Sequence, residues 1–141
     1  MYETAAETYR RVKVTTASGG NLVVLLYEAL LTNMKQARSA LNAGYTEKAH
    51  RHLIRAQEIL SELSCSLDMS AGGVAQNLMA LYHYCGGLLV KANLKKQAGP
   101  VEQAIAIVAP LFDAWRQVTT MTAAAEDNTT TATTYRMAAS D

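Results

Sequence analysis

Apolar residues alternate at spacings of four and three along one stretch in the middle of the chain. An α-helix turns once in about 3.6 residues, so this spacing places them on one face of a helix. An apolar stripe of this length has to be covered by other helices. The expected inward residues are Val74, Leu78, Leu81, Cys85, Leu88 and Ala92. The stretch therefore predicts a helix that packs lengthwise against others in an all-α fold.

Two stretches with the same spacing come earlier in the chain. The first covers residues 21–43, with Ser18 as its expected N-cap and Gly44 as the residue that ends it, because glycine takes positive φ freely. The second is expected to have Thr46 as its cap and to run to about Leu67. Since only two residues separate them, these helices must be antiparallel neighbours. Their expected inward residues are Val23, Leu26, Leu30, Met34, Ala37 and Leu41, then Ala49, Leu53, Ala56, Leu60, Leu63 and Leu67.

A fourth helix follows Gly99-Pro100, where glycine ends one helix and proline suits the first position of the next. Pro110 lies inside this helix and is expected to kink it, because proline removes one backbone hydrogen bond. The expected inward residues are Val101, Ala104, Ile105, Val108, Leu111, Phe112, Trp115 and Val118. Four helices joined by short loops predict an antiparallel four-helix bundle, and no β pattern competes with it.

The bundle is expected to span residues 18–118, with one segment on either side. Residues 1–17 are expected to form a flexible, polar N-terminal arm. Its larger apolar side chains are Tyr9, Val12 and Val14. Residues 119–141 are rich in Thr and Ala and bury too little apolar surface to offset their ordering entropy, so this tail is expected to be disordered.

The composition limits the class of protein. A formal net charge of +1 gives no field that attracts nucleic acid or an acidic membrane. No apolar block typical of a signal peptide occurs in residues 1–17, and the longest apolar run, residues 22–31, is about half the length that spans a bilayer. Cys85 falls on a helix seam and Cys65 beside one, so we expect a buried thiol, an outward thiol and no disulfide. We therefore expect a soluble cytoplasmic protein with no nucleic-acid partner and no membrane insertion.

No constellation of catalytic residues stands out. Residues 47–50 read Glu-Lys-Ala-His, the motif of carboxylate-bridged metal bundles, but that site needs a second copy and further inward carboxylates. His50 and His52 alternate, so they should point apart on a helix. His83 has no cysteine or carboxylate at ligand spacing. We expect no catalytic residue, no metal and no cofactor; a metal-binding bundle enzyme built on Glu47 and His50 is the alternative from another class.

The helices carry more apolar residues than one seam needs. The additional residues are Ile54, Ile59, Tyr82, Leu89, Ile105 and Phe112. They can belong to a broad core stripe, or they can line an exposed groove for an amphipathic partner helix. Spacing alone does not show which of these residues belong to the core and which line a groove.

Four blocks of sequence share their order and spacing with one known family over about residues 9–118. The blocks are Thr16-Ala17-Ser18 with Leu22-Val23-x-Leu25-Leu26-Tyr27, then Leu53-Ile54-x-Ala56-Gln57-x-Ile59-x-x-Glu62-Leu63-x-x-Ser66-Leu67-Asp68, then Asn77-Leu78-x-x-Leu81-Tyr82-x-Tyr84 with Leu88 to Lys96, and finally Ala114-Trp115. Together they resemble the FliS family, the flagellin-specific export chaperones of bacterial flagellar type III secretion. The sequence departs from the family's pattern at Gly19, at Glu28-Ala29, at Gly86-Gly87 in place of Arg-Arg, and at Pro110.

The resemblance implies a cytoplasmic chaperone that binds the disordered C-terminal segment of flagellin, prevents its premature polymerisation and delivers it to the membrane export gate. It implies a client-binding groove, for which we expect Ile54, Tyr82 and Leu89. It also implies that the arm with Tyr9, Val12 and Val14 lies over part of this groove as a lid and takes part in docking at the gate. Such a chaperone is expected to be a monomer or a weak dimer. The alternatives are a divergent bundle that binds another helical partner and a self-associating structural protein.

Overall fold

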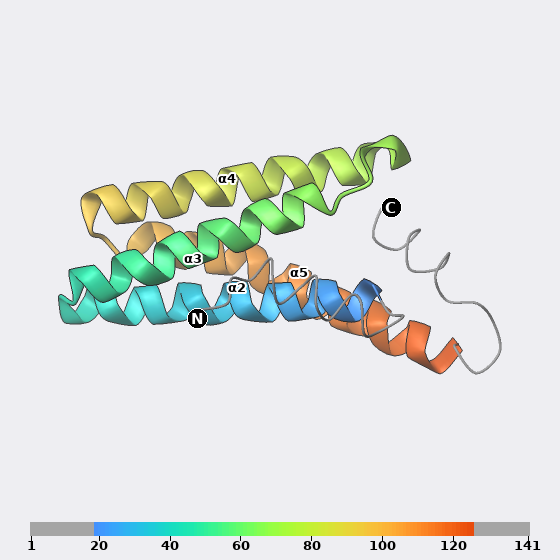
Figure 1. Cartoon of the computed structure of the whole chain (residues 1–141), viewed down its shortest axis with the longest axis horizontal. Coiled ribbons are helices and arrows are strands. Elements are labelled where there is room, and N and C mark those ends of the chain that lie inside the picture. Colours follow the sequence, from blue (N-terminus) through green and yellow to red (C-terminus); the bar gives the residue numbers. More distant parts are fainter. Residues whose placement is uncertain (1–18, 126–141) are drawn as a thin grey trace, which may run out of the picture.

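The computed structural model describes residues 19–125, which form four α-helices and one short 3-10 helix. The helices are α2 (Gly19–Ala43), α3 (Thr46–Cys65), α4 (Gly73–Lys95) and α5 (Gly99–Ala125), and the 3-10 helix η1 (Met69–Ala71) joins α3 to α4. Successive α-helices run in opposite directions and pack lengthwise (Figure 1). The described range holds no strand. The predicted all-α four-helix bundle is therefore confirmed.

The tight connection between α2 and α3 is built from backbone hydrogen bonds. Gly44 has a φ of 82°, as expected for a glycine that ends a helix. The Tyr45 amide donates to the Ala40 carbonyl at 2.8 Å, and the Ala49 amide donates to the Tyr45 carbonyl at 3.0 Å. Tyr45 therefore takes the N-cap position without a side-chain cap, and Thr46 is the first helical residue. The expectation that Thr46 caps this helix was wrong, because the loop is short enough to draw Thr46 into the first turn.

The other two connections are also locally satisfied. Asp68 accepts hydrogen bonds from the Ser70 amide at 3.2 Å and from the Ser70 hydroxyl at 2.6 Å, which starts η1. Gly72 then takes a φ of 103° before α4 begins. At the far end of α4, Lys96 adopts the left-handed conformation, and the Gln97 amide donates to the Ala92 carbonyl at 3.2 Å. These turns fix neighbouring helices side by side.

The core runs along the whole bundle. Most of the inward residues expected from α2, α3 and α5 are buried, and the others are half-buried. Cys85 is buried, Cys65 is exposed and both thiols are free, as the sequence indicated. Pro110 lies inside α5 without ending it, and α5 continues to Ala125, beyond the end expected at Val118. Ser18, the expected arm at residues 1–17 and residues 126–141 of the expected tail lie outside the described residues.

The inward face of α4 differs from the expected one. Val74 is exposed and Leu81 is only half-buried, so the seam expected through these two residues was wrong. The buried residues of α4 are Ala75, Leu78, Tyr82, Cys85, Leu88, Leu89 and Ala92. The helix is rotated toward Tyr82, because a buried phenol needs a hydrogen-bond partner and one is available across the core.

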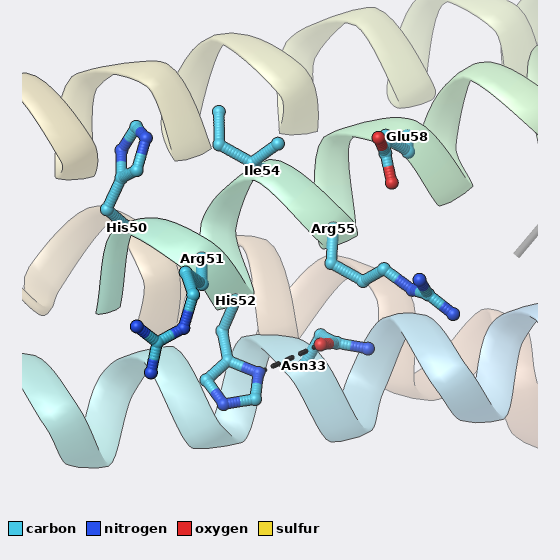
Figure 2. A pocket seen from close by; sticks show the side chains of 7 residues that line it. All are labelled: Asn33, His50, Arg51, His52, Ile54, Arg55 and Glu58. Carbon is cyan, nitrogen blue, oxygen red and sulfur yellow. Dashed lines mark hydrogen bonds between the residues drawn. The ribbon is translucent and has the colours of Figure 1, made fainter. Parts of the chain in front are cut away.

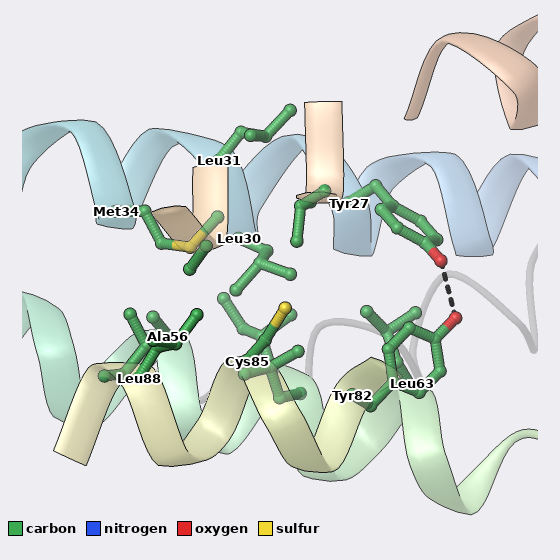
Figure 3. Packing of buried hydrophobic residues seen from close by; sticks show 14 of the residues in the cluster. Tyr27, Leu30, Leu31, Met34, Ala56, Leu63, Tyr82, Cys85 and Leu88 are labelled. Carbon is green, nitrogen blue, oxygen red and sulfur yellow. Dashed lines mark hydrogen bonds between the residues drawn. The ribbon is translucent and has the colours of Figure 1, made fainter. Parts of the chain in front are cut away.

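That partner is Tyr27 of α2 (Figure 3). The two phenol oxygens lie 2.5 Å apart in a hydrogen bond, and either hydroxyl can donate. The ring of Tyr27 also packs against Tyr82 and Trp115, with centroid distances of 6.3 and 6.4 Å. Burial raises the pKa of both phenols above the ordinary value, so both are neutral at physiological pH. This aromatic cluster ties α2, α4 and α5 together.

Candidate functional site

Two histidines of α3 point to opposite neighbours (Figure 2). His52 forms a hydrogen bond of 2.9 Å with Asn33 of α2, whereas the side-chain amide of Asn93 on α4 lies 2.8 Å from His50 Nδ1. The prediction that His50 and His52 point apart is confirmed. Each histidine therefore joins α3 to a different helix.

The contact between His50 and Asn93 shows which residues of α3 and α4 lie side by side along the bundle. Ile54 follows His50 by one helical turn, and Val90 precedes Asn93 by about one turn of the antiparallel helix, so Ile54 and Val90 lie at about the same level. Ile54 points toward α4 (Figure 2). Leu94 lies one turn beyond Val90 on the same face of α4. Ile54, Val90 and Leu94 are 39%, 43% and 79% exposed, and we call these three residues the α3–α4 apolar face.

A shallow groove of about 370 Å³ continues this face along the junction of α3 and α4. Its lining contains no Asp, Glu, Lys or Arg side chain, and it includes the edge of the buried Tyr82. The lining residues are Gln57, Leu60, Ser61, Ser64, Cys65, Tyr82, His83, Gly86 and Val90. A surface of this kind can bind the apolar side of another polypeptide, because no charge has to lose its hydration shell.

The residues expected in the client groove lie at different depths. Ile54 is accessible, whereas Tyr82 and Leu89 are 3% and 0% exposed and pack in the core. Leu89 is therefore out of reach of a partner while the bundle is closed, and Tyr82 presents only an edge. The arm residues Tyr9, Val12 and Val14 lie outside the described residues.

Sequence reasoning missed Val90 and Leu94 as exposed apolar residues. A signal for them exists, since His83, Gly87, Val90 and Leu94 step by four, three and four along one uncharged face of α4. The dominant apolar stripe of the same helix concealed this second face.

A second hollow of about 540 Å³ lies on the outer side of α3, around Ile54. Arg51, Arg55 and Glu58 border it together with the two histidines and Asn33. Partial burial, and then repulsion by Lys48 and Arg51, lowers the pKa of His52. Arg51 pairs with Glu47 at 3.7 Å, but both side chains are largely exposed, so this ion pair contributes little to stability. The hollow has a mixed polar border around one apolar residue.

The part of the chain that the structure describes was searched for metal-binding side chains and for helices that could span a membrane. Residues 19–125 hold no group of three or more His, Cys, Asp or Glu side chains placed to bind one metal ion. Glu47 and His50, the pair considered for a metal bundle, contact Arg51 and Asn93 instead. None of the helices in this range is both long enough and apolar enough to cross a bilayer.

These features define a class: a small four-helix bundle whose accessible surface includes apolar and small side chains along one helix junction. Within that class, residues 1–122 match the family described as flagellar protein FliS, and the chain belongs to this family.

Characterised relatives agree with this assignment. The chain is 31% identical to the flagellar secretion chaperone FliS of Bacillus subtilis over 77% of its own length and 81% of the relative. It is 30% identical to the protein of the same name from Salmonella typhimurium, over 74% of this chain and 79% of that one. It is 31% identical to the Escherichia coli protein of that name, over 74% of this chain and 78% of that one.

Proposed function

We propose that this chain is a cytoplasmic export chaperone that binds the disordered C-terminal segment of flagellin, prevents premature polymerisation and delivers flagellin to the flagellar export gate. Membership of the FliS family and the names of its relatives support this function. The chain acts by binding rather than by catalysis, as a monomer or weak dimer.

The observation that carries the proposal is the α3–α4 apolar face and the uncharged groove beside it. A flagellin segment that forms amphipathic helices needs an apolar surface to cover its own apolar side until it is exported. Ile54, Val90 and Leu94 provide such a surface on rigid helices, so the bundle gives up little conformational freedom on binding. The client loses conformational entropy when it becomes ordered on binding, and this loss lowers the affinity enough to keep the complex reversible.

Calorimetric titration of the full chain with a peptide of the flagellin C-terminus, followed by circular dichroism of the mixture, tests the proposal. We expect one-to-one binding at micromolar affinity or tighter with a gain in helix. Replacing Ile54 and Val90 together by Ser should weaken binding by about 10- to 100-fold, since each is a partly exposed aliphatic side chain that the client would cover. Leu25→Ser is the matched control, because Leu25 is a similarly exposed leucine on α2. Absence of both heat and added helix would refute flagellin as the client.

The N-terminal arm has a separate part in the proposal. Tyr9, Val12 and Val14 would cover part of the client groove until flagellin displaces them, and the arm would then contact the export gate. Deleting residues 1–15 should change the affinity for the flagellin peptide or the amount of flagellin exported. The lid is rejected if neither quantity changes.

Self-association is the second candidate, because Leu94 is the most exposed of the large apolar residues in the described range. Two copies of this chain could then cover each other's α3–α4 apolar face. Light scattering over a series of protein concentrations separates the two functions. A chaperone remains a monomer or a weak dimer, whereas a self-associating structural protein forms larger assemblies as the protein concentration rises.

A further inference from the structure

The glycine pair of α4 and the proline of α5 lie at the same level of the bundle. Tyr82 of α4 and Trp115 of α5 both contact Tyr27, which places these two residues at a common level. Gly87 follows Tyr82 by five residues, and Pro110 precedes Trp115 by five. Because α4 and α5 are antiparallel, both displacements run toward the loop that joins them, by about 7.5 Å. Gly86-Gly87 and Pro110 therefore lie at about the same level along the α4–α5 pair.

Packing does not require either glycine. A Cβ atom built on Gly86 or Gly87 would meet no atom within 4 Å, and neither residue has positive φ. Both lie inside a continuous α-helix, where glycine is the least favourable residue after proline, because it gains the most backbone freedom when the helix opens. The pair is thus the point at which α4 bends or opens most readily.

Pro110 weakens α5 at this same level. Proline has no amide hydrogen, so the Ala106 carbonyl lacks the donor that position 110 supplies in a regular helix. Proline also crowds the preceding turn, which favours bending away from its own side. Two adjacent helices therefore each have residues unfavourable to the helix at one level, glycine in α4 and proline in α5, although short turns hold both ends of α4.

We propose that α4 and α5 bend together at Gly86-Gly87 and Pro110, so that Gly73–Cys85 and residues 111–120 open away from α2 and α3 as one hinged half. The half nearer the α4–α5 loop stays closed, held by the hydrogen bond between His50 and Asn93. Opening uncovers the aromatic cluster of Tyr27, Tyr82 and Trp115 as an apolar surface that is absent from the closed bundle. The hinge is a property of the free chain and holds whatever the client is.

Cys85 reports this opening directly, because it is buried and immediately precedes the glycine pair. Burial raises the pKa of its thiol to about 11, so the closed protein presents it as an unreactive thiol. Cys65→Ser removes the exposed cysteine, and an excess of a chromogenic disulfide reagent then measures the labelling rate of Cys85 in the full chain. The rate is recorded at several urea concentrations below the unfolding transition and compared with global unfolding followed by circular dichroism.

A hinge predicts labelling that depends on urea less than half as steeply as global unfolding, since opening exposes only part of the core. Gly86→Ala with Gly87→Ala should slow labelling by about 20-fold, as expected when two glycines inside a helix become alanine. Gly73→Ala is the matched control, because Gly73 also has open space around its Cβ position but lies at the first residue of α4. We expect it to change the rate by less than about twofold, because propensity counts least at a helix end.

Two results would each overturn the hinge. One is labelling of Cys85 with the full urea dependence of global unfolding. The other is a double glycine variant that is labelled no more slowly than Gly73→Ala. Neither result bears on flagellin binding, because no client is present in the experiment.

Discussion

The phenol oxygens of Tyr27 and Tyr82 form a hydrogen bond of 2.5 Å inside the apolar core. It joins α2 to α4, two helices that are not consecutive in the chain. The bond fixes the rotation of α4, because any other rotation would leave a buried phenol without its partner.

Removing either hydroxyl should therefore destabilise the bundle. We expect Tyr27→Phe and Tyr82→Phe each to lower the free energy of unfolding by about 1–2 kcal/mol, since the remaining phenol loses its partner. The double variant should cost less than the sum of the two, with a coupling energy of about 1 kcal/mol. Urea unfolding of the four proteins in this cycle measures the coupling. Additive effects would mean that the two phenols do not depend on each other.

The same two phenols predict a loss of stability at alkaline pH. Burial raises the pKa of Tyr27 and of Tyr82 above the ordinary 10.0, so the folded state retains protons that the unfolded state releases. This contribution to stability is complete below pH 10 and falls as the pH rises further. Unfolding by urea at a series of alkaline pH values should show the fall, and Tyr82→Phe should make it shallower. An unchanged slope in that variant would contradict the assignment.

Glycine substitutions should have opposite signs at two kinds of position. Gly86→Ala and Gly87→Ala are each expected to raise the free energy of unfolding by about 0.5–1 kcal/mol, because both glycines are inside α4 with open space at the Cβ position. Gly44→Ala should lower it by about 1 kcal/mol, because Gly44 has a φ of 82°. Urea midpoints of the three variants test the contrast. Destabilisation by either substitution in α4 would show that packing does require glycine there.

His52 should make the protein less stable in mild acid. Its pKa in the folded state is lowered from 6.5, first by partial burial and then by Lys48 and Arg51, so the unfolded chain takes up the proton first. The contribution of His52 is complete above pH 6.5 and is lost as the pH falls through the folded-state pKa. His52→Gln should flatten the dependence of unfolding free energy on pH between about pH 5 and 7. If the unfolding free energy depends on pH equally steeply in the unchanged protein and in His52→Gln, groups other than His52 are responsible for that dependence.

Sequence spacing was sufficient for most of the fold because three of the helices have one dominant apolar face. The fourth, α4, has two candidate stripes one residue apart, through Leu81 and Leu88 or through Tyr82 and Leu89. Hydrophobicity alone favours the first stripe, because it has Val74 and Leu81 where the second has Ala75 and Tyr82. The choice depends on a hydrogen bond from another helix, and no property of α4 by itself encodes that partner.

The candidate site was harder to predict for a related reason. Of the three residues expected in the groove, Ile54 lies on the surface, whereas Tyr82 and Leu89 lie in the core. Val90 and Leu94 were missed, although their spacing is present in the sequence, because another stripe of α4 is more apolar. Exposure depends on how much of a stripe the neighbouring helices cover, which the spacing within one helix does not determine.

The two-residue connection at Gly44-Tyr45 also has a consequence for how the chain folds. Contacts between α2 and α3 join residues that are close in sequence, so closing that hairpin costs less chain entropy than bringing α5 back onto α2. We therefore expect the α2–α3 hairpin to form the folding nucleus and the α4–α5 pair to dock on it later. The hinged half would then belong to the part of the molecule that docks last. Its opening would be a partial reversal of that last folding step.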